Sequence, residues 1–88
     1  MVEYKLEFSP HGLESIEYLD KNIIQRIFDK LKWLISRADE ISHIPLRSNL
    51  SGLYKLRVGD WRIIYEIDHK KRMIRVHKIG HRRDIYKI

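Results

Sequence analysis

Basic side chains alternate with apolar ones along three strands predicted at 52–58, 61–68 and 72–79. Successive side chains of a strand point to opposite faces of a sheet, so apolar residues that face a core leave the others together on the second face. That face is expected to carry Glu66 and five basic groups: Lys55, Arg57, Arg62, Arg75 and His77. Like charges on adjacent strands repel, so this cluster favours an anionic ligand such as phosphate. The alternative is a solvated sheet face, protected by long Lys and Arg side chains.

A second cationic group follows the last predicted strand, in the segment 80–86, which reads GHRRDIY. Its arginines, Arg82 and Arg83, are placed where the chain can fold back over the basic sheet face. Histidine titrates near neutral pH, so His81 is a candidate for proton transfer. Tyr86 offers an aromatic surface on which a base could stack. A terminus without a functional role, with the tyrosine against the core, is equally compatible with this composition.

The charge is divided unevenly along the 88 residues. Residues 1–44 carry six basic and eight acidic side chains, whereas residues 45–88 carry twelve and four. The net charge of +6 therefore arises entirely from the second half. A strongly basic half favours a polyanionic partner, of which nucleic acid is the commonest, with a basic solvated surface as the alternative.

Composition also disfavours several classes of site. No apolar run exceeds three residues, so no membrane span and no signal-peptide core is expected. The chain contains no cysteine, which excludes disulfides and thiolate zinc sites and suits a reduced compartment, the cytoplasm. His11, His43 and His69 show no metal-ligand spacing and are expected at the surface or in loops. The sequence therefore indicates neither a metal nor a cofactor.

The first part of the chain predicts one strand and a short helix. Residues 2–8 alternate apolar and charged side chains, as a half-buried strand does. Ser9-Pro10 then supplies a helix N-cap followed by proline in the first turn. Leu13, Ile16 and Leu19 are expected to line the buried face of this helix.

A second helix is predicted by the broad apolar stripe over 23–35, with Asn22 and Gln25 at capping-box spacing at its start. A loop that contains Pro45 then leads to the three strands. The predicted order is β-α-α-β-β-β, in a single α+β domain formed by residues 1–88. In it a helical hairpin packs on one face of a mainly antiparallel sheet.

Two segments carry a family resemblance. Segment 53–67 reads LYKLRVGDWRIIYEI, and segment 81–86 reads HRRDIY. The first resembles the central signature of the RelE/ParE superfamily of toxin–antitoxin toxins, and the second resembles the family's His-Arg-x-x-x-Tyr ending. Ser9-Pro10 and Leu50-Ser51-Gly52 are similar to the family as well. The resemblance extends over nearly the whole chain and implies a RelE-like fold.

The RelE-like branch implies an endoribonuclease that cuts messenger RNA in the ribosomal A site and thereby inhibits translation. The family's functional positions fall on Lys55, Arg57, Arg62, Arg82 and Tyr86. Better-studied relatives often have lysine where this chain has Arg57, and their tyrosine lies farther from the preceding glycine. Arg82 and Arg83 therefore remain alternatives for the functional arginine of the tail.

Such a reaction needs no metal ion, because the ribose 2′-hydroxyl of RNA can attack the adjacent phosphorus. Arg62 and Arg82 are expected to stabilise the negative charge that develops on the phosphate. Lys55 is expected to bind phosphate or to act as a base, and His81 is a candidate acid or base. The other positions expected to bind RNA phosphates are Arg75, His77 and Arg83.

The resemblance also implies partners, namely a cognate RelB-like antitoxin, the ribosome and messenger RNA. The antitoxin is expected to be partly helical and to cover the helix at 23–35 or an edge of the sheet. Two alternatives share the fold. One is a ParE-like toxin that inhibits DNA gyrase by binding, and the other is an RNA-binding module without catalysis. Arg82, Arg83 and Tyr86 argue against the first, because the ParE branch tends to lack them.

Overall fold

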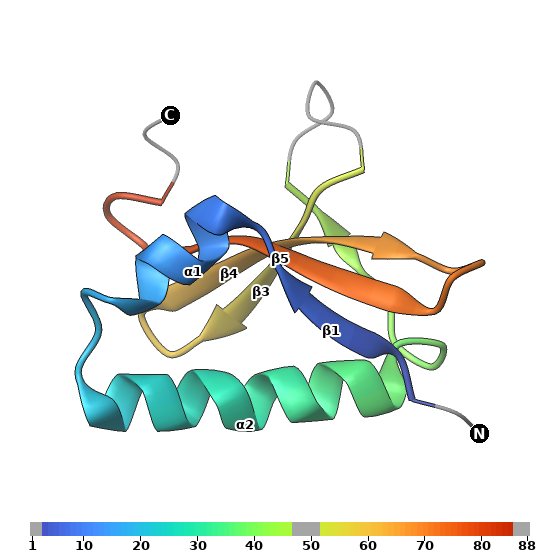
Figure 1. The fold of residues 1–88 in the computed structure, drawn as a ribbon, viewed down its shortest axis with the longest axis horizontal. Coiled ribbons are helices and arrows are strands. Elements are labelled where there is room, and N and C mark those ends of the chain that lie inside the picture. Colours follow the sequence, from blue (N-terminus) through green and yellow to red (C-terminus); the bar gives the residue numbers. More distant parts are fainter. Residues whose placement is uncertain (1–2, 47–51, 86–88) are drawn as a thin grey trace.

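Two helices pack on a mixed five-stranded sheet in the computed structural model, which describes residues 3–46 and 52–85 (Figure 1). The elements in chain order are β1 (Lys5–Phe8), α1 (Pro10–Ile16), α2 (Lys21–Arg37), β2 (Ile44–Pro45), β3 (Tyr54–Val58), β4 (Trp61–Asp68) and β5 (Met73–His81). The strands lie in the order β1-β5-β4-β3-β2, with β1 parallel to β5 and the other neighbours antiparallel. The predicted α+β class and the order of the predicted elements are thus confirmed, with one short strand, β2, added.

The loop expected around Pro45 contains a short strand, which is a difference from the prediction. In β2, Ile44 and Pro45 pair with Lys55 and Tyr54 of β3. Proline has no amide hydrogen and is tolerated at the edge of a sheet, and β2 is an edge strand. At the other edge, β1 begins at Lys5, later than expected, where its pairing with β5 starts.

Helix α1 starts where the sequence predicts, because Ser9 Oγ accepts a hydrogen bond from the Gly12 N–H at 3.0 Å. The expected burial of Leu13 is wrong, since 56% of its surface is exposed. The helix instead presents Gly12 to β5, where an added Cβ would collide with the carbonyl oxygen of Val76. This close approach holds α1 beside β5, beyond the end of β1 (Figure 1).

Helix α2 begins two residues earlier than the capping-box spacing indicates. Asp20 is its N-cap, and the Asp20 carboxylate accepts a hydrogen bond from the Ile23 N–H at 3.0 Å. Asn22 lies inside the first turn, and Gln25 donates to Asp29 at 2.9 Å instead of closing a capping box. The predicted apolar stripe is confirmed, with its centre fully buried at Ile27, Leu31 and Leu34.

A β-bulge in β5 separates the two faces of the sheet. Ile64 pairs with Lys78 whereas Tyr65 pairs with Val76, so His77 is the extra residue. After this bulge Lys78 shares the face of Ile64, and Ile79 returns to the core, where it is 4% exposed. The core-facing side chains of β4 and β5 pack with those of α2 in one cluster.

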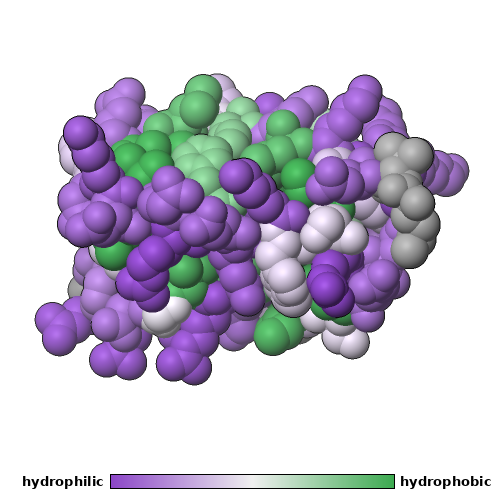
Figure 2. Space-filling model, turned by 90° about the horizontal axis from the view of Figure 1, so that it is seen from below, coloured by the Kyte–Doolittle hydropathy of each residue, from purple (hydrophilic) through white to green (hydrophobic). Residues whose placement is uncertain are grey.

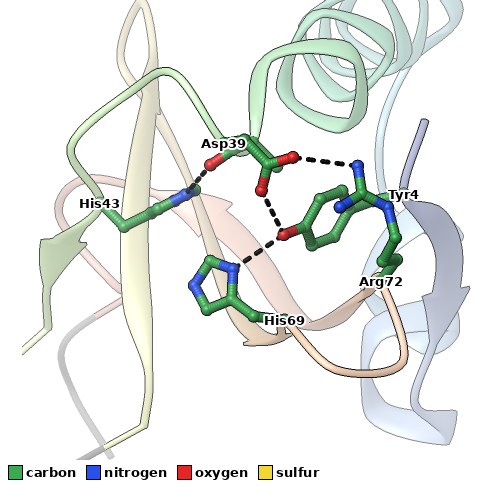
Figure 3. Close-up of polar contacts among 6 residues, drawn as sticks. Tyr4, Asp39, His43, His69 and Arg72 are labelled. Carbon is green, nitrogen blue, oxygen red and sulfur yellow. Dashed lines mark hydrogen bonds and ion pairs between the residues drawn. The ribbon is translucent and has the colours of Figure 1, made fainter. Parts of the chain in front are cut away.

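A polar network closes the opposite end of the sheet from the β3–β4 turn (Figure 3). The Tyr4 hydroxyl donates to Asp39 Oδ1 at 2.6 Å, and His69 Nδ1 lies 2.7 Å from the same hydroxyl. Arg72 completes the network with an ion pair to Asp39 Oδ2 at 2.9 Å, and its guanidinium lies over the Tyr4 ring. These contacts tie the entry to β1, the end of α2 and the β4–β5 turn together.

His43 occupies a second part of this end. Its Nε2 donates to the Ala38 carbonyl oxygen at 2.8 Å, so its Nδ1 accepts from the Tyr65 hydroxyl at 2.6 Å. Burial is the main cause that raises the pKa of Tyr65, which therefore stays protonated as the donor. His43 lies in the loop before β2, as expected of a surface or loop histidine, but its ring is half-buried and bonded on both nitrogens.

The Asp39 network predicts a pH-dependent stability. The hydrogen bond from Tyr4, followed by the contacts of Arg72, lowers the pKa of Asp39 below its ordinary value. The resulting stabilisation is complete above the pKa of the unfolded chain, about 4, and is lost as the pH falls through the lower folded value. Asp39→Asn should therefore reduce the free energy of unfolding at pH 7, and the difference from wild type should shrink in acid. Urea denaturation at both pH values checks this.

The matched control is Glu40→Gln, which changes the neighbouring carboxylate and its exposed 3.6 Å pair with Arg37. This variant should unfold with nearly the wild-type free energy at both pH values. A difference between Asp39→Asn and wild type that stays constant down to acid pH would contradict the proposed linkage.

Candidate nucleic-acid interface

Two guanidinium groups converge on the turn between β3 and β4. Arg57 and Arg62 face each other in the β3–β4 register. Arg62 Nη1 donates to the Gly59 carbonyl oxygen at 3.0 Å and to the Trp61 carbonyl oxygen at 2.9 Å. Arg57 Nε donates to the same Gly59 oxygen at 3.4 Å. One backbone carbonyl thus holds two cations that would otherwise repel each other.

The turn itself requires glycine. Gly59 has φ +59, whereas Asp60 has a negative φ, which matches a two-residue hairpin turn of type II′. A side chain at Gly59 would be strained and would also meet the guanidinium of Arg26 from α2. A third arginine, Arg26, therefore lies next to this turn from the side of α2, a position that the helical pattern does not predict.

The tail brings a further arginine to the same turn. The backbone N–H of Arg82 donates to the Asp60 carbonyl oxygen at 2.8 Å, and Arg82 Nε lies 3.7 Å from Asp60 Oδ1. The Asp84 and Ile85 amides then donate to the His81 carbonyl oxygen, which turns the chain back. Arg82 is thus the tail arginine with contacts to the turn, whereas Arg83 is exposed and donates its backbone N–H to His81.

Ile85 anchors this tail. Its side chain is 1% exposed and forms a small apolar cluster with Leu46 and Ile64 on the face of the sheet opposite α2. The Cβ that alanine would have at position 80 lies 3.0 Å from Ile85, so Gly80 leaves room for the anchor. Burial of a single isoleucine therefore sets the position of the adjacent arginines.

The expected continuous basic face is wrong in one respect, because this apolar cluster divides it. On one side of the cluster lie Arg57, Arg62 and Arg82 at the turn. On the other side, His77 Nε2 lies 2.9 Å from Glu66 Oε1, and Arg75 is opposite Glu66 in the register. Burial of the Ile64 cluster and the two-sided sheet register together produce this division.

Acidic groups offset the second of these regions more than expected. Parallel pairing with β1 places Glu7 opposite Arg75, so Glu66 is not the single opposing charge. Lys78 joins the same face because of the bulge at His77, and sequence reasoning missed it. The apolar residues Ile74, Val76 and Ile79 are spaced by two residues and then by three. This break in the alternation is the signal that could have revealed the bulge. Lys55 lies between the regions, opposite Ile64.

His81 is oriented by the tail. Its Nδ1 accepts the Arg83 N–H at 3.2 Å, so the neutral ring carries its proton on Nε2. The ring lies edge-on to Trp61, with centroids 5.5 Å apart. Tyr86, the remaining predicted site residue, and Leu50-Ser51 of the family pattern lie outside the described residues.

Two other properties bear on possible chemistry. Among residues 3–46 and 52–85, no group of three or more His, Cys, Asp or Glu side chains could hold a metal ion. In the same part of the chain, no helix has the length and apolar character needed to cross a membrane. The candidate site at the turn consists of the guanidinium groups, the His81 imidazole, backbone carbonyls and the Asp60 carboxylate.

Comparisons with known proteins agree with this architecture. A family model described as "ParE toxin of type II toxin-antitoxin system, parDE" matches residues 6–86. Toxin RelG of Mycobacterium tuberculosis is 26% identical over 84 residues, which cover 96% of this chain and 97% of the relative.

Solved structures show the same fold. The toxin–antitoxin complex RelBE2 of Mycobacterium tuberculosis has a TM-score of 0.80 at 22% identity, covering 91% of this chain and 99% of that chain. The isolated RelE toxin of E. coli has a TM-score of 0.75 at 21% identity, with 89% and 83% covered. With the family match over nearly the whole chain, these likenesses place the protein in the RelE/ParE superfamily, as a toxin of a type II toxin–antitoxin system.

Proposed function

We propose that this toxin is a metal-independent endoribonuclease that cuts messenger RNA on the ribosome. The observation that carries the proposal is the convergence of Arg57, Arg62 and Arg82 on the Gly59–Asp60 turn. Guanidinium groups bind phosphate through paired N–H donors and keep their charge at any physiological pH. Three of them at one turn can hold the backbone of RNA and stabilise a phosphate that gains negative charge.

The reaction begins when the ribose 2′-oxygen attacks the adjacent phosphorus. A bond forms between the 2′-oxygen and phosphorus, the bond from phosphorus to the 5′-oxygen breaks, and a 2′,3′-cyclic phosphate remains. A base must take the 2′-hydroxyl proton, and an acid must give a proton to the departing 5′-oxygen. Arg62 and Arg82 stabilise the charge on the phosphate, while Lys55 and His81 are the groups assigned to proton transfer.

Relatives support the catalytic reading over gyrase inhibition. The curated relative is named Toxin RelG, and the solved structures include the RelE toxin of E. coli. The family model, by contrast, carries a ParE description.

Expression of the toxin in cells separates the two activities, because a nuclease leaves new transcript ends in translated messages. A DNA damage response without such ends would identify a gyrase inhibitor instead.

Arg62→Ala should reduce cleavage of translated message by about a hundredfold or more, since it removes a donor to the developing charge. The fold should stay intact, because Arg62 lies on the face opposite the core. Cleavage is measured with purified ribosomes programmed with a defined message. Lys55→Ala and Arg82→Ala should also reduce it, with losses that are not additive if they act on one phosphate.

Arg37→Ala is the matched control, since Arg37 lies in the last turn of α2 and makes an exposed pair with Glu40. This variant should cleave at the wild-type rate. If Arg62→Ala cleaves as fast as Arg37→Ala, the guanidinium cluster at the turn is not the site of cleavage.

Ile85→Ala tests the anchor of the tail without removing any charge. The loss of a fully buried isoleucine from a small cluster should cost about 2 kcal/mol of stability. Because Arg82 loses its fixed position beside Asp60, cleavage should fall even under conditions where the variant is fully folded. Circular dichroism reports the folded fraction, and the ribosome assay reports the rate. A folded Ile85→Ala variant with wild-type cleavage would show that the position of the tail is unimportant.

An antitoxin is the other partner in this proposal. Solved complexes of RelB with RelE from Pyrococcus horikoshii and Methanococcus jannaschii are among the similar structures. The surface seen from the side of α2 is mostly hydrophilic, with hydrophobic patches between charged side chains (Figure 2). An amphipathic segment with acidic side chains fits such a surface, and it would compete with RNA if it also covered the turn at Gly59–Asp60.

Ribosome binding by the free toxin should weaken steeply with salt, because bound phosphates release counterions. Three phosphate contacts predict a slope of about −2 for the logarithm of the affinity against that of salt concentration. Co-sedimentation of the toxin with ribosomes across a salt series measures this slope. A much smaller fraction of the toxin should co-sediment when it is bound to the antitoxin. Binding that hardly responds to salt, or that persists unchanged in the complex, would contradict the proposed interface.

A further inference from the structure

A cleft of about 300 Å³ lies between α1 and the end of the β4–β5 ladder. This volume is near the lower limit for small-molecule sites, which suits a ligand of the size of a single base. Rings and carboxylates are prominent in its lining: His11, Glu14, Tyr18, Trp61, His81 and Asp84. His81 is the member of this set that also belongs to the proposed RNA interface.

The cleft contains aromatic surface that is not buried in the core. Tyr18 follows α1 and has 80% of its surface exposed. An aromatic ring contributes most to stability or binding when its apolar surface is buried, so this ring is available to a ligand. Trp61 packs one side against the core and remains half-buried, with the His81 ring edge-on to it at 5.5 Å. Exposed rings of this kind stack on nucleic-acid bases.

The cleft and the guanidinium cluster share the same end of the sheet. Trp61 and His81 are register partners in the last pair of the β4–β5 ladder, and each is followed directly by an arginine, Arg62 and Arg82. Arg62 also donates to the carbonyl oxygen of Trp61. An RNA strand whose phosphate binds the arginines can therefore turn around this end and place its next base in the cleft.

We propose that the cleft is a nucleobase subsite that selects a base with an exocyclic amino group. Guanine, adenine and cytosine have such a group, and uracil does not. This inference rests on the proposed nuclease function. The rings of Tyr18 and Trp61 stack on the base, and the Glu14 carboxylate accepts a hydrogen bond from the amino group, as acidic side chains do from cytosine N4 in DNA.

Charge favours a base over other occupants. Two carboxylates, Glu14 and Asp84, line the cleft and repel phosphate, whereas the neighbouring turn gathers arginines that attract it. The backbone of RNA therefore belongs at the turn and the base in the cleft. An acidic antitoxin segment is disfavoured in the cleft for the same reason.

Direct binding tests the subsite without any ribosome. Trp33→Phe leaves Trp61 as the single tryptophan of the chain, so its fluorescence reports on the cleft. Titration with the 5′-monophosphates of guanosine, adenosine, cytidine and uridine should quench this emission, with uridine monophosphate binding at least fivefold more weakly than the others. Tyr18→Ala should weaken all four by about tenfold, and Glu14→Gln should remove the discrimination against uridine.

Two controls lie beside the cleft without lining it. Leu13→Ala removes an exposed side chain of α1, and Glu17→Gln changes a carboxylate at the end of the same helix. Both should bind the four nucleotides as the wild type does. Equal affinity for uridine and cytidine monophosphates, or equal effects of the controls and the cleft variants, would overturn the subsite.

Ribosome assays separate this inference from the nuclease proposal. Messages that differ at one base beside the cut should be cleaved in the same order as the nucleotides bind, and Glu14→Gln should abolish that order. Normal cleavage with a base order unchanged by Glu14→Gln would overturn the subsite and leave the nuclease intact. Nucleotide binding without any cleavage would overturn the nuclease and support the subsite. Loss of antitoxin binding in Tyr18→Ala, with nucleotide binding unchanged, would assign the cleft to the antitoxin.

Discussion

Burial of one face of the β3–β4–β5 meander beneath α2 fixes where every charged side chain of the other face lies. Ile27, Leu31 and Leu34 of α2 are fully buried in the same cluster as Ile63 and Tyr65 of β4. Because a shift of one residue would expose that whole apolar set, the register of the strands is strongly determined. Arg57 and Arg62 are consequently opposite each other at the turn, although their mutual repulsion opposes that position.

The positive charges at the two ends of the sheet have different kinds of partner. At the Gly59–Asp60 turn the cations are held by backbone carbonyls and by one exposed carboxylate, so much of their charge stays available to a ligand. At the other end, Arg72 is paired with Asp39 and stacked on Tyr4. The Arg72 ion pair therefore stabilises the folded chain, whereas arginines that are held mainly by neutral carbonyl oxygens keep a positive charge that can bind phosphate.

Most of the architecture is predictable from the sequence, since strand alternation and the helical stripe are local signals. The N-cap of α1 at Ser9 and the turn at Gly59 follow from residue type alone. Three features were not predictable, because each depends on contacts between distant segments. They are the Tyr4–Asp39 network, the apolar cluster around Ile85 and the parallel pairing that places Glu7 opposite Arg75. The sequence therefore indicates which basic residues can form the candidate site, but not their division into two separate regions.

The position of β5 between β1 and β4 has a consequence for synthesis of the protein. Lys5 and its neighbours in β1 have their hydrogen-bonding partners in β5, with almost all of the described chain between them. Such long-range pairing is slow to form, and it cannot begin until β5 has emerged from the translating ribosome. The Ile85 anchor and Arg82 emerge later still. A nascent chain therefore cannot pair β1, or position its tail arginine beside the β3–β4 turn, until β5 and the residues after it have been made.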